Sequence, residues 1–313
     1  MNKVIHKFRD MPVALTGLAL GVAGISGALS TFLGQIPIFI GDFISFILVT
    51  IIFIKDCLHF DQLKNEISHP TLGSFIPTFD MTLMTLAGFI ANYNLFIGRS
   101  LWIVSIIIHI IFCFSFFYYR IKNFEIHHVI PSWFVPPVGI VVACVSGANM
   151  NFPQITHIIF YIGFILYLIM LPIMMYRIIF VEHLDDGRLP TFAIMAAPPS
   201  LCLAGYLTSF SNPSEVIIYI LLPLAVFMTM LVYVSFFRIL RISFNPSYAS
   251  FTFPLAIGAT AFLKYSNYLV SIESDYYLLW KYIGITLSIS ASIIITIIFI
   301  KMILYIKKFI ITA

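Results

Sequence analysis

Long apolar blocks, separated by short polar stretches, recur along the whole chain. They cover residues 12–32, 37–54, 75–93, 100–119, 133–150, 154–175, 191–208, 215–237, 249–266 and 278–305. About 20 apolar residues, at a rise of about 1.5 Å each, form a helix long enough to cross the hydrocarbon core of a bilayer. The pattern therefore predicts an all-α integral membrane protein with ten transmembrane helices in a single domain, 1–313.

Composition supports this class and excludes a water-soluble one. Hydrophobic residues make up 61% of the chain, charged residues only 10%, and the mean hydropathy is +1.03. A soluble domain needs more charge to cover its surface. The first apolar block follows a basic start, and its full spanning length favours a retained helix over a cleaved signal. We expect the lipid bilayer as a partner, and no nucleic acid.

Basic residues are distributed unevenly over the predicted loops. With ten spans, only Arg99, Lys264 and Lys281 fall on one side of the membrane. The remaining 14 of the 17 fall at the termini or in alternate loops: Lys3, Lys7, Arg9, Lys55, Lys64, Arg120, Lys122, Arg177, Arg188, Arg238, Arg241, Lys301, Lys307 and Lys308. Because Lys and Arg near short loops stay on the cytoplasmic side, we predict a multi-pass protein of the cell membrane with both termini cytoplasmic.

Prolines mark a repeat of two spans. One set precedes odd-numbered spans at intervals of 61, 59 and 56 residues: Pro70, Pro131, Pro190 and Pro246. A second set follows six to eight residues later, inside the span: Pro77, Pro137, Pro198 and Pro254. Proline inside a helix removes a hydrogen bond and kinks it. We therefore expect one architectural unit, a kinked hairpin, to be used repeatedly.

Odd spans carry small residues, whereas even spans are rich in Ile, Phe and Leu. Five hairpins in the same orientation predict an inner ring of odd helices around a central pore, with even helices facing lipid. The ring would gather five helix N-termini and the basic loops at its cytoplasmic mouth, which favours anions. The pore-lining candidates are Gly17, Gly21, Pro77, Asp80, Pro137, Gly139, Ala197, Pro198, Pro254 and Gly258.

The candidate functional groups among the ionisable residues of the apolar blocks are Asp42, Asp80, His109, His157 and Lys264. Such residues are costly in a membrane and are candidates for function. Asp80 has two interpretations, a proton-coupling site or a carboxylate that caps structure. Lys264 either adds positive charge to the outer vestibule or extends to the interface.

Phe253 is the candidate gate of the pore. It directly precedes Pro254, the kink proline of the ninth span. At the matching offset, the seventh span has Ala197 and the fifth span has Val138. One large aromatic opposite smaller residues predicts a plug. The alternative is an ordinary phenylalanine of the packed core.

Four short motifs resemble a known family of transporters. They read HP at 69–70, PSWFVP at 131–136, RILR at 238–241 and SFTFPLA at 250–256. With them the chain resembles the tellurite-resistance/dicarboxylate transporter family, which includes the bacterial TehA proteins and the plant guard-cell slow anion channels. The resemblance implies five hairpins around a pore, a homotrimer, small anions as the transported species, and pore occlusion by Phe253. Asp80 and the lack of long tails depart from the plant channels.

Two transport functions follow from these observations. The first is a channel, or channel-like transporter, for small inorganic or organic anions. The alternative is a proton-coupled carrier of C4-dicarboxylates or of a related oxyanion such as tellurite or sulfite, with Asp80 titrating. The chain has no acid–base pair or metal-ligand cluster at a suitable spacing, so we expect no catalytic residues, no metal, no cofactor and no enzymatic activity.

Overall fold

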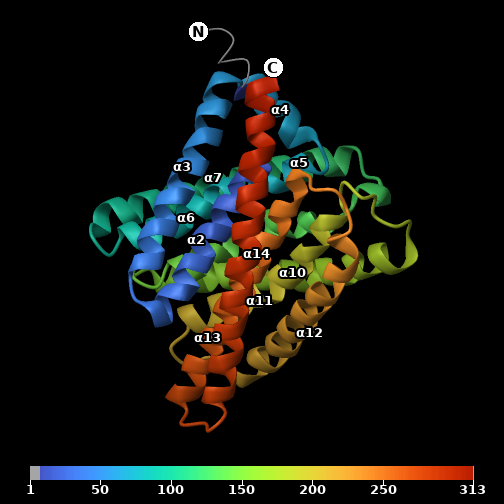
Figure 1. Cartoon of the computed structure of the whole chain (residues 1–313). Helices are drawn as coiled ribbons and strands as arrows, with labels where there is room; N and C mark the ends of the chain where they lie inside the picture. Colours follow the sequence, from blue (N-terminus) through green and yellow to red (C-terminus); the bar gives the residue numbers. More distant parts are fainter. Residues whose placement is uncertain (1–7, 313) are drawn as a thin grey trace.

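The computed structural model describes residues 8–312, which form helices and no strand (Figure 1). Lys3 and Lys7, two of the basic residues used for orientation, lie outside this range. The α-helices are α2 Ala14–Leu33, α3 Ile36–Leu58, α4 Phe60–Ser68, α5 Leu72–Phe75, α6 Thr78–Ile90, α7 Leu95–Lys122, α8 Val135–Val138, α9 Val142–Ser146, α10 Pro153–Phe180, α11 Ala197–Ser209, α12 Glu215–Ile239, α13 Thr252–Ser271 and α14 Tyr277–Thr312. The 3-10 segments are η1 Ile126–His128, η2 Pro131–Phe134, η3 Gly139–Val141, η4 Leu189–Ala196 and η5 Pro246–Phe251.

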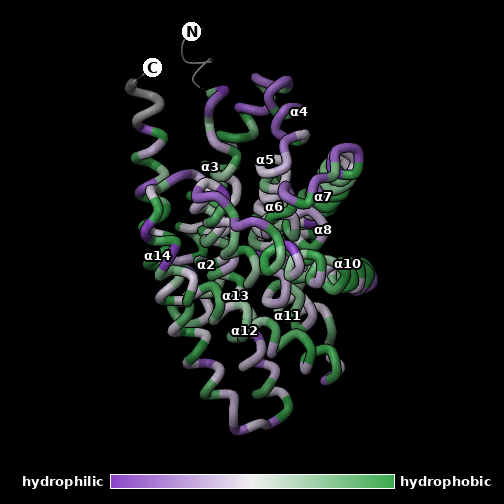
Figure 2. Tube along the Cα trace, turned by 90° about the vertical axis from the view of Figure 1, so that its right-hand side faces the viewer, coloured by the Kyte–Doolittle hydropathy of each residue, from purple (hydrophilic) through white to green (hydrophobic). Residues whose placement is uncertain are grey.

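Apolar helices dominate the chain, as expected for an all-α membrane protein. In the described residues, eight helical stretches are long and apolar enough to cross a membrane. The two other expected spans are helical as well: 131–146 is a broken helix, and 246–271 comprises η5 and α13. Figure 2 shows hydrophobic α10 and the polar end formed by α4. The fold class is confirmed, and the count of ten membrane crossings stays a prediction.

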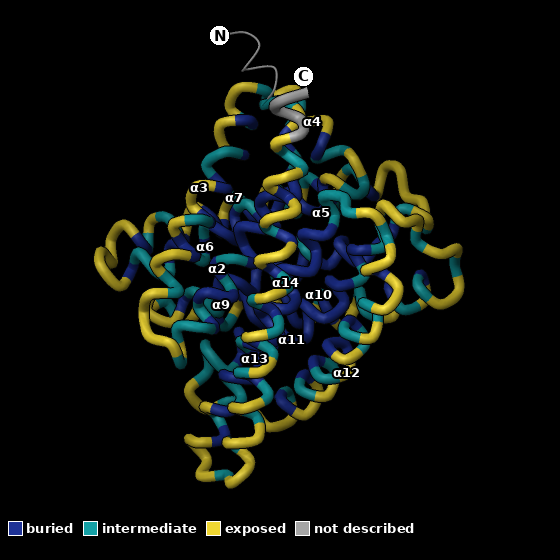
Figure 3. The backbone as a smooth tube through the Cα atoms, viewed as in Figure 1, coloured by how far each residue is buried: buried dark blue, intermediate teal, exposed yellow. Residues whose placement is uncertain are grey.

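The helices form an inner and an outer layer. In the odd-numbered spans α2, α5–α6 and η4–α11, between 67% and 83% of the most apolar window is buried inside the protein. In the even-numbered spans α3, α7, α10, α12 and α14, only 28% to 33% of that window is buried. Figure 3 shows buried backbone at the centre and exposed backbone around it. The even helices therefore leave most of their apolar surface to an outside medium, which for such residues is lipid.

The inner segments close into a ring. Neighbouring pairs in contact are α2 with α6, α6 with α9, α9 with α11, α11 with α13, and α13 with α2. Hydroxyl groups join the ring where the chain's first repeat meets its second and fifth. Thr16 Oγ1 lies 2.6 Å from Thr78 Oγ1, and Thr252 Oγ1 donates to the Gly17 carbonyl at 2.9 Å. The ring thus closes between segments that are more than 230 residues apart in sequence.

The repeated prolines mark a change of helix type. In the third, fourth and fifth repeats, a 3-10 segment precedes the α-helix, and Pro137, Pro198 and Pro254 lie in the first turn of the α-helix. Pro77 is the N-cap of α6. In a first turn the N–H of a residue has no partner within the helix, so proline costs little there. The expected kink is therefore a junction between two helical segments, and the prolines start the second one.

One end of the molecule carries the polar loops. α4 and the C-terminal end of α14 lie at the top of Figure 1, and the α13–α14 connection lies at the bottom. The Lys55 Nζ of α3 donates to Glu66 Oε1 of α4 at 2.5 Å, and the lysine is fully buried. This pair fixes α4 against the end of α3.

Candidate functional site

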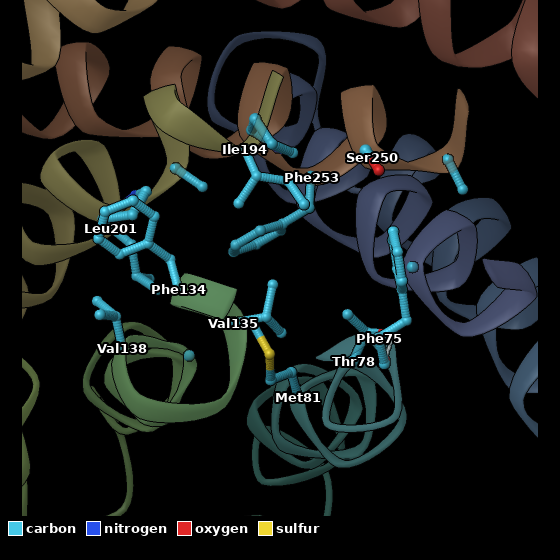
Figure 4. Close-up of a pocket in the computed structure, with 16 residues that line it drawn as sticks. Phe75, Thr78, Met81, Phe134, Val135, Val138, Ile194, Leu201, Ser250 and Phe253 are labelled. Carbon is cyan, nitrogen blue, oxygen red and sulfur yellow. Dashed lines mark hydrogen bonds between the residues drawn. The ribbon is translucent and has the colours of Figure 1, made fainter. Parts of the chain in front are cut away.

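A small cavity lies on the axis of the ring. It measures about 40 Å³, and residues of all five inner segments line it (Figure 4). The lining is Gly17, Phe75, Thr78, Met81, Phe134, Val135, Val138, Gly139, Ile194, Ala197, Pro198, Leu201, Ala249, Ser250, Phe253 and Pro254. None of these residues is charged, and most are apolar or small. The lining comes from the first halves of the inner segments.

A second, larger cavity lies along the second halves of the same segments. It measures about 310 Å³ and is more polar than the first. Its hydrophilic lining residues are Thr31, Asp42, Thr85, Asn92, Ser146, Asn149, Thr260, Lys264 and Asn267. Asp42 belongs to the outer helix α3, and Lys264 belongs to α13. They are the two charged residues among those that line this cavity.

Phe253, like Leu201, is common to the linings of the two cavities. In Figure 4 its ring points into the space between Ile194 and Val135. On its other side the ring lies beside Gly24, where a Cβ would come within 3.7 Å of the ring atom Cδ2. The side chain is only half-buried, because the cavities leave room on both faces of the ring.

The two glycines expected to line the pore from α2 have different surroundings. A Cβ on Gly17 would meet its nearest atoms at 3.9 Å, which is ordinary contact, and Gly17 lines the first cavity. On Gly21 a Cβ would lie 2.2 Å from the Thr252 Cβ. Gly21 is outside both cavity linings, and its missing side chain lets α2 approach α13 closely.

The remaining small and proline candidates also divide into two groups. Those that line the first cavity are Gly139, Ala197, Pro198 and Pro254. Pro77 and Pro137 are buried outside the cavity linings, and Gly258 lies between α11 and α12, where a Cβ would be 3.5 Å from Thr229 Oγ1. Pro77 and Pro137 therefore shape the helix junctions, and Gly258 allows close packing around the axis.

Asp80 lies outside both cavities and is bonded to His109. Asp80 Oδ1 is 2.5 Å from His109 Nδ1, and the other ring nitrogen, Nε2, is 2.8 Å from the Pro136 carbonyl oxygen. Both side chains are completely buried. A carbonyl only accepts, so Nε2 carries a hydrogen, and the carboxyl and Nδ1 share one proton. In either arrangement of that proton the pair has no net charge, and it ties α6 and α7 to α8.

The loop before η4 holds a surface ion pair at the polar end. Arg188 Nε donates to Asp185 Oδ2 at 2.5 Å. Partial burial of Asp185 opposes its ionisation, but the hydrogen bonds from Arg188 outweigh this and hold the pKa of the carboxyl below its usual value. The pair orders the loop, and it also reduces the positive charge that Arg188 offers to an anion.

Sequence reasoning missed several lining residues one turn away from those it named. Leu201 follows Ala197 by four positions, Phe134 precedes Val138 by four, and Ala249 precedes Phe253 by four. Residues four apart lie on one face of a helix. Extending each predicted position by one turn would have found them.

Comparison with known proteins agrees with this architecture. The family model described as "SLAC1: Voltage-dependent anion channel" matches residues 10–303. Two relatives are uncharacterized transporters of Methanocaldococcus jannaschii. MJ0762 is 28% identical over 161 residues, 47% of this chain and 47% of the relative, so the match spans about half the relative's length. MJ0576 is 25% identical over 258 residues, 72% of this chain and 74% of the relative. The family resemblance drawn from the sequence motifs is confirmed.

Proposed function

Because the chain belongs to the SLAC1 family of anion channels and transporters, we propose that it passes small anions through the axis of its inner ring. The pathway runs through the first cavity, past Phe253, and through the second cavity. Neutral, small side chains line the first part, and polar groups with Lys264 line the second. Such a lining offers helix dipoles, hydroxyls and one ammonium to an anion.

The position of Phe253 carries the proposal. Its side chain lines both cavities, and it comes from the segment that closes the inner ring of helices against α2. We propose that the ring occludes the pathway at rest and swings aside to open it. Gly24 and the half-buried state of the ring leave space for that motion.

Membrane placement and assembly are part of the same proposal. The distribution of basic residues supports a cell-membrane protein with both termini cytoplasmic, which places the first cavity toward the cytoplasm and the second toward the outside. The family resemblance supports a homotrimer. Native mass spectrometry in detergent would test the trimer, and labelling of single cysteines introduced into the α4 and α13–α14 loops would test the orientation.

Current recordings test the transport function. Wild type and Phe253→Ala are placed in planar bilayers with chloride or nitrate as the permeant anion and an impermeant cation. The proposal expects currents that reverse at the anion equilibrium potential and are larger in Phe253→Ala. Currents that follow the cation, or none in either protein, would refute it.

A proton-coupled carrier is the second candidate, because Asp80 and His109 share a buried proton beside the first cavity. Their neighbours Met81 and Gly139 line that cavity, while the pair itself does not. Coupling would require the proton to reach the pathway during transport. Asp80→Asn would then abolish dicarboxylate uptake driven by a pH gradient into proteoliposomes. Under the channel function, Asp80→Asn leaves ohmic anion current in place.

A further inference from the structure

We propose that Asp42 and Lys264 form a charge switch in the second cavity, in which protonation of Asp42 leaves the Lys264 ammonium as the one charge of the lining that the transported anion meets. This inference rests on the proposed function and adds a regulator to it. Asp42 is 4% exposed, and its Oδ1 has no hydrogen-bond partner among the described residues. A buried carboxylate without partners is rare, because its charge is then not compensated.

Packing of α3 against α2 holds Asp42 at the cavity wall. A Cβ on Gly41 would lie 2.3 Å from Ser26 Cβ, so the two helices touch at this level. One turn further along α3, Ser45 Oγ donates to the Ala19 carbonyl at 2.8 Å. Most of α3 is lipid-facing, but these contacts turn the Asp42 side of the helix inward to the second cavity.

Lys264 is the opposite charge in the same cavity. In the described chain, neither Lys264 nor Asp42 makes an ion pair within 4 Å. Both charges therefore act on the contents of the cavity that they line. With Asp42 ionised, the net charge of the pair is zero; with Asp42 protonated, it is +1. An anion in the cavity interacts favourably only with the second state.

The other titratable groups near α3 either bond to different partners or lie far from Asp42 along the helix. α2 contributes no titratable residue, and on α6 Asp80 is bonded to His109. Tyr93, in the loop after α6, packs against Phe39 and is exposed. The remaining charged groups near α3 belong to its opposite end and to α4: Lys55, Asp56, Asp61, Lys64 and Glu66. Among the described residues, Lys264 is the one charged side chain that shares the cavity wall with Asp42. Lys264 also lines a further cavity, in which the titratable neighbours are His157 and Tyr268.

Anion flux measured at symmetrical pH tests the switch. Proteoliposomes with wild type or Phe253→Ala are loaded with chloride, and efflux is followed at equal inside and outside pH between about 5 and about 8. Equal pH on both sides removes any driving force from a proton gradient. A unit charge across a cavity of this size is expected to change anion occupancy by about five- to tenfold, so efflux should be larger by that factor at the acidic end.

Variants of Asp42 and Lys264 show which residue causes the pH dependence of chloride efflux. Asp42→Asn should give the high efflux at every pH. Lys264→Gln lowers the net charge of the pair by one at every pH, so its efflux should be lower than that of wild type at each pH and should still rise at the acidic end. The double variant Asp42→Asn/Lys264→Gln has neither charge, and its efflux should vary less than twofold with pH. Asp275→Asn, an exposed carboxylate in the α13–α14 loop outside the cavity lining, is the matched control and should keep the wild-type pH profile.

Two results overturn the inference. If Asp42→Asn keeps the wild-type pH profile, or if Lys264→Gln passes as much chloride as wild type at every pH, the switch is refuted, although chloride efflux still supports the channel. If no variant releases chloride at any pH, the proposed function fails and the switch fails with it. The Lys264→Gln protein decides the matter if Asp42→Asn does not insert correctly.

Discussion

Replacing Phe253 by Ala removes the aromatic ring that lines both cavities and that we propose as the gate. The size of the effect follows from what holds the ring in place. A half-buried phenylalanine gains about 1–1.5 kcal/mol from burial, roughly half of a fully buried one. Turning it aside through an unfavourable rotamer adds about 0.5–1.5 kcal/mol. We therefore expect an opening free energy of about 1.5–3 kcal/mol to limit conduction through the wild-type pore.

Removing that barrier should raise anion conductance by about 10- to 150-fold, because each 1.4 kcal/mol corresponds to a factor of about ten. The assay is single-channel or macroscopic current in planar bilayers, normalised to the amount of inserted protein. Phe253→Leu keeps apolar bulk without the ring and should lie between wild type and Phe253→Ala. The reversal potential should stay at the anion equilibrium potential in all three.

A matched control separates the gate from general loosening of the fold. Phe192 is also half-buried, belongs to the inner segment η4, and lies outside both cavity linings. Phe192→Ala should leave conductance close to that of wild type. Equal conductance of Phe253→Ala and wild type, in protein that is folded and inserted, would refute the gate. A similar increase in Phe192→Ala would attribute the effect to loosened packing.

Two further predictions concern packing and the buried ion pair. Gly21→Ala should destabilise the protein by about 1–3 kcal/mol, because the added Cβ would lie 2.2 Å from Thr252 Cβ. Gly17→Ala should unfold like wild type but pass less chloride, because the added methyl group narrows the first cavity. Thermal unfolding in detergent and chloride efflux measure the two effects, and equal stability of both variants would contradict the packing account. Lys55→Met should cost about 3–5 kcal/mol by leaving Glu66 uncompensated, and adding Glu66→Leu should recover most of that loss. If Lys55→Met alone unfolds like wild type, the buried pair contributes nothing.

Helix positions could be predicted from the sequence because apolar length and repeat spacing are local signals. The expected block 215–237 is the helix Glu215–Ile239, and 154–175 lies within Pro153–Phe180. The junctions between 3-10 and α-helix could not be predicted, because the same prolines are compatible with a kinked helix. Which helix type precedes a proline depends on the packing of the whole ring.

The roles of the glycines depended on residues far away in the chain. Gly17 and Gly21 lie one turn apart on the same face of α2, and both fit the pattern of a small-residue stripe. What separates them is Thr252, whose hydroxyl donates to the Gly17 carbonyl and whose Cβ fills the space beside Gly21. No local pattern in the first repeat contains that information.

The surroundings of the two carboxylates in the apolar blocks, Asp80 and Asp42, also depend on residues that are distant in the sequence. Asp80 and Asp42 both lie in apolar blocks, and the sequence favoured Asp80 because it belongs to an inner segment. Its inner position instead brings it against His109 of the next helix, which neutralises it away from the pathway. Asp42 belongs to an outer helix, yet the close contact of α3 with α2 turns it toward the second cavity and Lys264. An outer helix can thus contribute a charged side chain to a cavity inside the ring, wherever its contact with an inner helix is close enough.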